Sequence, residues 1–228
     1  MKRVLTLFYG LIAYAGFLYA FLYLIGFTGN LEINNSIDGN PRVSIPLAIG
    51  VDVTLILLSV GAFSLLKKPS IGNRFEKLIP KPVQRSTAVL IASVGFLLAT
   101  SQWEPVRGVV WMVTNETIRT IILFVYLFGW STVFMSSFLL DHFSLFGLKH
   151  CWFYFKSKRS ATAPFPVAFF YRFVRQPFCL GILLALWATS TMTIAHLLLA
   201  TVGSVYLFIL MPVEGKGLYM NYRQNYVN

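Results

Sequence analysis

Charged residues are scarce in this sequence of 228 residues: only 12% are Asp, Glu, Lys or Arg, whereas 57% are hydrophobic. Soluble domains usually carry about a quarter charged residues, so a chain this poor in charge cannot cover a water-facing surface. Acidic residues are the scarcest, with 8 against 19 Lys and Arg. The 2 cysteines, Cys151 and Cys179, are too few for a disulfide framework. These shortages predict a bundle of helices embedded in a bilayer.

Long apolar runs take the place of the missing charge. A helix needs about 20 apolar residues to cross about 30 Å of hydrocarbon. The candidate spans are residues 4–27, 45–66, 87–103, 118–140, 177–191 and 193–211. The last two are short and flank the polar run Ala188–Thr193, so they predict a tight helical hairpin. Either the first arm begins earlier, within residues 167–175, or the hairpin lies low in the bilayer. The predicted fold class is an all-α integral membrane protein, a single domain of about six transmembrane helices (five to six).

The basic residues orient this bundle. They gather at the N-terminus, in the loop after residue 66 and in the segment 141–176, whereas the loops 28–44 and 104–117 each hold one Arg and two acids. Cytoplasmic loops carry the excess of Lys and Arg, which predicts that the N- and C-termini are both cytoplasmic. Since the cations flank membrane segments, they predict no nucleic-acid partner, and no metal is expected either.

The segment 141–176 is the only long stretch without a predicted span. Its run Cys151-Trp-Phe-Tyr-Phe-Lys-Ser-Lys-Arg159 mixes aromatic and basic residues. Such a mixture suits an interfacial helix whose rings lie at headgroup level while its cations remain in water. We expect a cytoplasmic membrane-surface anchor here, in preference to a substrate contact.

Ionisable residues inside apolar segments are the default functional candidates in a membrane protein. Asp52 lies in the second run, either close to the water interface, which we favour, or as a buried partner of a polar group. His196 begins a stripe of small and polar residues with Ala200 and Ser204. A second stripe consists of Gly181, Ala185 and Thr189. Close packing of helices through small residues explains both stripes without a ligand.

A polar cluster is expected where the two arms of the hairpin end. Because antiparallel arms bring their outer flanks together, Tyr171–Pro177 and Met211–Leu218 should meet at the cytoplasmic interface. The cluster contains Arg172, Arg175, Gln176, Glu214 and Lys216. It suits a zwitterionic, water-soluble cofactor whose reactive end points into the membrane. The alternative is the ordinary ring of charges that ends transmembrane helices.

The same residues carry a resemblance to a known family. The runs Tyr171-Arg-Phe-Val-Arg-Gln-Pro-Phe-Cys-Leu-Gly181 and Ala185-Leu-Trp-Ala-Thr-Ser-Thr-Met-Thr-Ile-Ala-His196 resemble the C-terminal part of methanethiol S-methyltransferases. These enzymes belong with the isoprenylcysteine carboxyl methyltransferase and NnrU-like membrane proteins. Upstream, Ile79–Thr87, Val109-Val-Trp111 and Asp141-His-Phe-Ser-Leu-Phe-Gly-Leu-Lys149 fit the same subfamily. The resemblance extends from about residue 60 to residue 218.

The resemblance implies methyl transfer from S-adenosylmethionine to a small thiol, which gives dimethyl sulfide when the thiol is methanethiol. It also implies a cofactor site built around Arg-His-Pro-x-Tyr-x-Gly and a later Glu-Glu pair. The residues that this carries over, together with His196 from the hairpin, are Arg175, Gln176, Pro177, Gly181 and Glu214.

The sequence departs from the family pattern at several of these positions. Gln176 replaces the histidine of the motif, Cys179 the tyrosine and Gly215 the second glutamate, and a Gln-His-Ser signature appears as Ala62-Phe63-Ser64. The departures keep alternatives open. One is a catalytically silent relative that serves as a membrane binding or assembly protein. Another is a methyltransferase for a lipophilic acceptor such as a prenyl-cysteine or a phospholipid. A transporter is disfavoured, because no clear pair of broken helices is seen.

Overall fold

The computed structural model describes residues 2–31, 36–66, 79–106, 108–139, 141–157 and 167–208, with the backbone alone given for 60–66 and 167–176. The chain divides into two compact units. Unit 1 is Met1–Arg107 with Ser137–Ala163, and unit 2 is Gly108–Ser136 with Pro164–Asn228.

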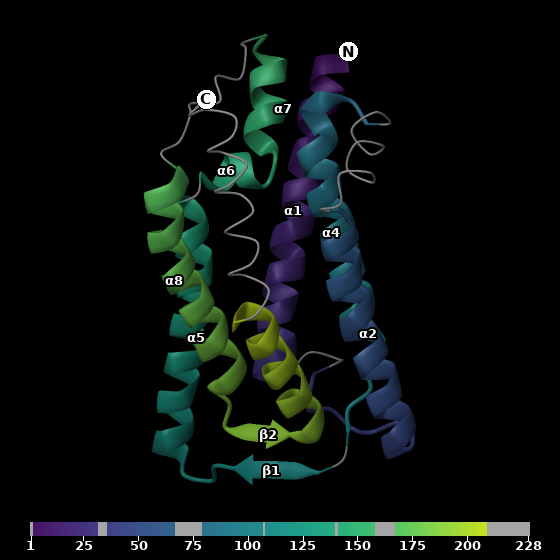
Figure 1. Cartoon of the computed structure of the whole chain (residues 1–228), viewed down its shortest axis with the longest axis vertical. Coiled ribbons are helices and arrows are strands. Elements are labelled where there is room, and N and C mark those ends of the chain that lie inside the picture. Colours follow the sequence, from purple (N-terminus) through teal and green to yellow (C-terminus); the bar gives the residue numbers. More distant parts are fainter. Residues whose placement is uncertain are drawn as a thin grey trace. The chain divides into compact units, whose positions relative to one another are not determined.

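Unit 1 is a helical unit centred on its N-terminal helix (Figure 1). Its elements are α1 (Lys2–Gly29), α2 (Ile45–Leu66), the short 3-10 helix η1 (Lys81–Val83), α4 (Gln84–Ser101), α6 (His142–Leu145) and α7 (Leu148–Phe155). α1 packs against α4 and α7, and α4 also packs against α2 and η1. Gly10 makes room for Cys151 of α7 against α1, because a Cβ there would lie 2.7 Å from Cys151 Sγ.

Unit 2 combines helices with a two-stranded antiparallel ribbon. Its elements are β1 (Val109–Met112), the greater part of α5 (Glu116–Leu139), α8 (Val167–Trp187), β2 (Thr191–Thr193) and the closing helix (Ile194–Phe208). In the ribbon, Trp111 faces Met192 and Met112 faces Thr191, with an irregularity between Val109 and Trp111. The Asn115 side chain accepts a hydrogen bond from the Ile118 N–H at 3.1 Å, which caps the start of α5.

The helices have the length and the surface of membrane helices. Among the described residues, three helices are long and apolar enough to cross a bilayer, Lys2–Gly29, Lys81–Ser101 and Glu116–Leu139, and shorter apolar helices cover Ile45–Ser59, Pro177–Trp187 and Ile194–Phe208. Large apolar side chains point outward along α5, with Phe124 70% exposed and Phe128 64%. Exposed apolar area on this scale marks a surface that meets lipid. The chain is an all-α integral membrane protein, as predicted.

Hydroxyl side chains inside these helices are satisfied by the helices themselves. Ser93 donates to the Val89 carbonyl at 2.9 Å, Ser136 to the Thr132 carbonyl at 2.7 Å, and Thr201 to the Leu197 carbonyl at 2.8 Å. Since hydrocarbon offers no hydrogen bonds, these internal bonds let polar residues lie in membrane helices at little cost.

The hairpin differs in detail from its prediction. α8 begins at Val167, the earlier start that was one of the two alternatives for the first arm, and it ends at Trp187. The helix therefore takes in part of the stretch predicted as an interfacial segment. Residues 191–193, where a tight turn was expected between the two helices, form a strand. The strand forms because the β-branched Thr191 and Thr193 find a partner in the Val-rich strand β1.

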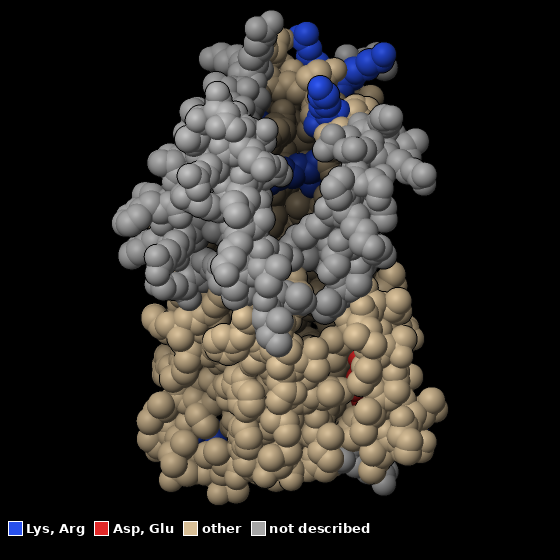
Figure 2. Space-filling view, in the orientation of Figure 1, with Lys and Arg blue, Asp and Glu red and all other residues tan. Residues whose placement is uncertain are grey.

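Most of the described cations of unit 1 gather at one end, whereas Arg42 lies in the loop between the end of α1 and the start of α2. On the face drawn in Figure 2, most Lys and Arg atoms lie where α1 begins and α7 ends. Arg3 Nη1 donates to Ser157 Oγ at 2.5 Å, which ties the start of α1 to the end of α7. η1, which carries Lys81, contacts both helices.

Candidate functional site

The closing pair of helices in unit 2 consists of α8 and the closing helix, joined through β2. Trp187 Nε1 donates to Ser204 Oγ at 3.0 Å. Gly203 makes room for Leu186, since a Cβ on Gly203 would lie 2.9 Å from Leu186 Cδ1. The two helices therefore pack together, and Figure 1 shows that they run in opposite directions. The start of α8 and the end of the closing helix therefore lie at the end of the pair away from β2.

The predicted cofactor motif lies on one of these flanks. Arg175, Gln176 and Pro177 are consecutive residues of α8, and Pro177 lies inside the helix. Proline has no N–H to donate to the carbonyl four residues earlier, so the hydrogen-bond ladder of α8 is interrupted beside Arg175 and Gln176. Glu214, predicted to complete the cluster, lies outside the described residues.

His196 ties the first turn of the closing helix to the end of α8. Its side chain is 0% exposed. The ring Nε2 lies 3.1 Å from the Leu186 carbonyl, and because a carbonyl can only accept, Nε2 carries the proton and donates it. The backbone N–H of His196 donates to Thr193 Oγ1 at 3.2 Å. These contacts are explained by helix packing without a ligand, which was one interpretation of the stripe that His196 begins. A cofactor contact of His196 stays a prediction.

Gly181 brings α8 into backbone contact with α5. A Cβ on Gly181 would lie 2.7 Å from the Gly129 carbonyl oxygen, and a Cβ on Gly129 would lie 2.8 Å from the Gly181 carbonyl oxygen and 2.9 Å from the Ala185 nitrogen. The stripe that contains Gly181 and Ala185 therefore packs on α5, as close packing through small residues predicts. Whether Gly181 also contacts a cofactor stays a prediction.

A buried histidine in unit 1 was not among the predicted site residues. His142 Nε2 lies 2.8 Å from the Tyr14 hydroxyl, and His142 Nδ1 lies 2.6 Å from Ser137 Oγ. Its ring stacks on Phe138 at 4.3 Å between centroids. Burial lowers the pKa of His142, so the imidazole is neutral at pH 7 and can accept a hydrogen bond from one hydroxyl while it donates a hydrogen bond to the other. The only sequence signal for it was its place in the run Asp141–Lys149.

Asp52 is fully buried in unit 1, whereas its place near the water interface of the bilayer stays a prediction. The carboxylate oxygen Oδ1 accepts the Glu104 N–H at 3.0 Å. Asp52 Oδ2 and the Nε1–H of the neighbouring residue Trp103 have no hydrogen-bond partner among the described residues. Asp52 is the buried partner of a backbone polar group, which was the alternative prediction.

The helix α7 has the composition predicted for a membrane surface. Trp152 is 43% exposed, and Lys156 Nζ lies 4.6 Å from the centroid of its ring. Lys149 pairs with Asp141 at the start of the same region. An exposed ring beside a cation is the arrangement that headgroup-level helices use.

Comparison with known proteins places the whole chain among membrane methyltransferases. The chain is 33% identical over 228 residues to the methanethiol S-methyltransferase of Crocosphaera subtropica, covering 100% of this chain and 89% of that protein. It is 36% identical over 220 residues to the methanethiol S-methyltransferase of Mycobacterium tuberculosis, covering 96% of this chain and 89% of that protein. A nurim homolog of Drosophila pseudoobscura pseudoobscura is 27% identical over 196 residues, 81% of this chain and 76% of that protein. No family model and no solved structure matches the chain.

Proposed function

Because the chain belongs to the methanethiol S-methyltransferase family, we propose that it is a membrane methyltransferase that moves a methyl group from S-adenosylmethionine to a small thiol. The relatives are named for methanethiol, and methylation of methanethiol gives dimethyl sulfide. The observation that carries the proposal is the 33% identity that extends across 100% of this chain.

The residues that would hold the cofactor lie on the flanks of the closing helix pair. When bound, S-adenosylmethionine supplies a sulfonium methyl group, which a thiolate takes by in-line displacement. Gly181 packs against α5, and the His196 ring is hydrogen-bonded to the Leu186 carbonyl. The cofactor's charged end is therefore assigned to Arg175, Gln176 and Glu214. Arg175 suits a carboxylate, and Glu214 suits an ammonium group or ribose hydroxyls.

The N- and C-termini are proposed to face the cytoplasm, where a water-soluble cofactor is supplied. The basic loops support this orientation through the positive-inside rule, and so does the gathering of Lys and Arg at one end of unit 1 in Figure 2. With GFP fused after Asn228 in a bacterial host, the fusion should fluoresce, whereas alkaline phosphatase fused there should be inactive. The opposite pair of results would reverse the orientation.

Calorimetric titration of the purified full chain with S-adenosylmethionine tests the proposal. Glu214→Gln should weaken binding about tenfold or more, since a hydrogen bond to a charged group contributes about 1.5–3 kcal/mol. Glu116→Gln is the matched control, because the Glu116 side chain is 94% exposed at the start of α5 and should leave binding unchanged. Gln176→His should restore the family residue and raise the affinity.

Turnover is measured as dimethyl sulfide formed from methanethiol in the headspace of the same samples. Failure to bind S-adenosylmethionine at millimolar concentration would refute the enzyme proposal and favour the catalytically silent relative. Binding without dimethyl sulfide formation would refute methanethiol as the acceptor and favour a lipophilic one.

A further inference from the structure

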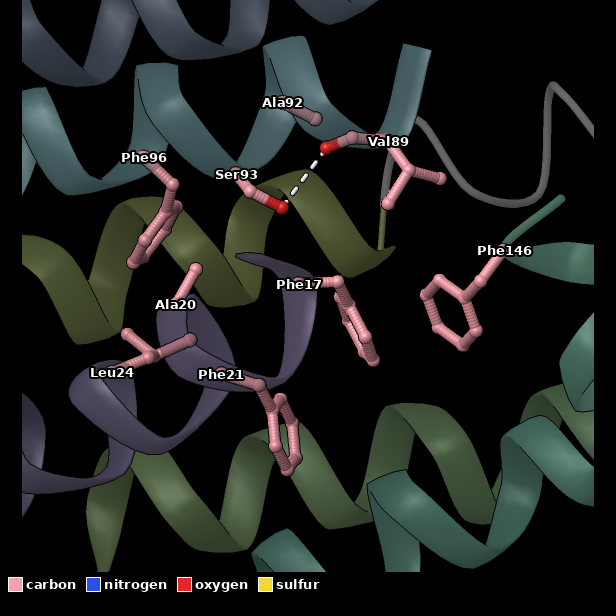
Figure 3. Close-up of a pocket in the computed structure, with 9 residues that line it drawn as sticks. All are labelled: Phe17, Ala20, Phe21, Leu24, Val89, Ala92, Ser93, Phe96 and Phe146. Atoms are coloured by element: carbon pink, nitrogen blue, oxygen red, sulfur yellow. Dashed lines mark hydrogen bonds between the residues drawn. The ribbon is translucent and has the colours of Figure 1, made fainter. Parts of the chain in front are cut away.

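A cavity of ≈ 270 Å³ lies in unit 1 between α1 and α4, and the turn between α6 and α7 adds one ring to its wall. Figure 3 shows the aromatic rings and small aliphatic side chains that surround it. The lining residues are Phe17, Ala20, Phe21 and Leu24 of α1, Val89, Ala92, Ser93 and Phe96 of α4, and Phe146. The cavity belongs to no part of the predicted cofactor motif.

The lining offers nothing to a charged ligand. None of the 9 lining residues is ionisable, and the one polar side chain among them, Ser93, already donates its hydroxyl to the Val89 carbonyl at 2.9 Å. A charged or zwitterionic molecule would lose its hydration here without a compensating partner. The cavity therefore excludes S-adenosylmethionine and suits a neutral, apolar molecule.

The aromatic part of the wall favours sulfur and is held in place. The rings of Phe17 and Phe146 stack with centroids 3.7 Å apart, and Phe21 lies 5.9 Å from Phe17. Phe146 meets the His142 ring edge-on at 4.8 Å, and His142 is fixed by its two hydroxyl contacts. Thiol and thioether sulfur atoms make favourable contacts with aromatic rings, often at the ring edge.

The pocket has room for a small ligand. An apolar cavity of about 150 Å³ binds benzene, so a pocket of ≈ 270 Å³ is large enough for a thiol or thioether of a few carbons.

We propose that this pocket binds the small thiol acceptor and the thioether product as neutral molecules, which reach it through the hydrocarbon core of the bilayer. The identification of the ligand as an organosulfur compound rests on the proposed function, whereas its neutral and apolar character rests on the lining alone.

Saturation-transfer NMR with dimethyl sulfide on the full chain in lipid nanodiscs tests the pocket. Ala92→Phe places a ring at the exposed mouth of the pocket and should weaken dimethyl sulfide binding by about tenfold or more (about 1.4 kcal/mol). Phe21→Leu keeps an apolar side chain but removes a ring, and should weaken binding to a smaller extent. Val94→Phe is the matched control: Val94 lies on α4 outside the lining and is 47% exposed, so binding should match that of the unmodified chain.

The outcomes separate this inference from the proposed function. The pocket assignment would be overturned if dimethyl sulfide binding survives both Ala92→Phe and Phe21→Leu. It would also be overturned if binding falls equally in Val94→Phe. If dimethyl sulfide binds in lipid-free detergent but not in nanodiscs, then a lipid acyl chain occupies the pocket in the bilayer. This result would also overturn the pocket assignment. Titration of Ala92→Phe with S-adenosylmethionine should give unchanged affinity. A chain that binds the thioether in this pocket but never binds S-adenosylmethionine would sink the proposed function and leave the pocket standing.

Discussion

Replacing Gly181 by alanine tests the backbone contact between α5 and α8. The added Cβ would lie 2.7 Å from the Gly129 carbonyl oxygen and 3.0 Å from the Val133 nitrogen. Both are backbone atoms, which cannot rotate away as the end of a side chain can. The helices would have to separate by several tenths of an ångström, and every contact along their shared face would loosen with them.

Two opposing terms set the size of the effect. Alanine stabilises a helix relative to glycine by about 0.8–1.0 kcal/mol, whereas forcing an extra carbon into a packed contact costs about 1–3 kcal/mol. Gly181→Ala should therefore be neutral to about 2 kcal/mol destabilising. Gly95 in α4 is the matched control, because a Cβ there would meet nothing within 4 Å. Gly95→Ala keeps only the favourable term and should stabilise the protein by up to about 1 kcal/mol.

Thermal unfolding of the three proteins in one detergent measures the difference. The expected order of melting temperatures is Gly95→Ala at or above the unmodified chain, and Gly181→Ala below Gly95→Ala. If Gly181→Ala melts together with Gly95→Ala, then α5 and α8 are not in backbone contact at this point, and the packing role assigned to Gly181 is refuted.

Three further experiments test buried groups in unit 1. Asp52→Ala should lower the free energy of unfolding by about 1–3 kcal/mol, because the Glu104 N–H loses its acceptor. Asp52→Asn keeps an oxygen at this place and should lower the free energy of unfolding less. Chemical denaturation of both variants measures the difference. Burial raises the pKa of the Cys151 thiol, so maleimide should label it only after denaturation, and rapid labelling of the native protein, detected by mass spectrometry, would contradict its burial. Because burial lowers the pKa of His142, the unfolded chain binds a proton below about pH 6.5 that the folded chain does not. Stability should therefore fall as the pH drops from about 7.5 to 5. The melting temperature of His142→Gln should decline less over this range. An unchanged slope would contradict the contribution assigned to His142.

The membrane fold could be predicted because apolar length is a local property. The runs at residues 4–27 and 118–140 are read directly from composition, and the structure places α1 and α5 over them. The ribbon could not be predicted in the same way. β1 and β2 are short, and each is stable only because the other lies beside it, although they are far apart in the chain.

The candidate site likewise combines residues that can be proposed from the sequence with contacts that cannot. The polar flank around Arg175 could be proposed as a site because its residue types follow a family motif, which the sequence displays. The setting of His142 was not found, because its partners Tyr14 and Ser137 come from two other helices. Gly181 shows a further limit: a glycine required by a neighbouring helix and a glycine required by a ligand look identical in a sequence.

The ribbon also constrains how unit 2 can move. The Val113 N–H donates to the Ser190 carbonyl at 2.8 Å, and the Ile194 N–H donates to the Gly108 carbonyl at 3.1 Å, so the strands stay bonded up to the helices that follow them. The start of α5, the end of α8 and the start of the closing helix are thereby fastened to one another at a single edge. Because these helices are joined at one edge, they can separate only at the opposite edge, toward which Arg175 and Phe208 lie.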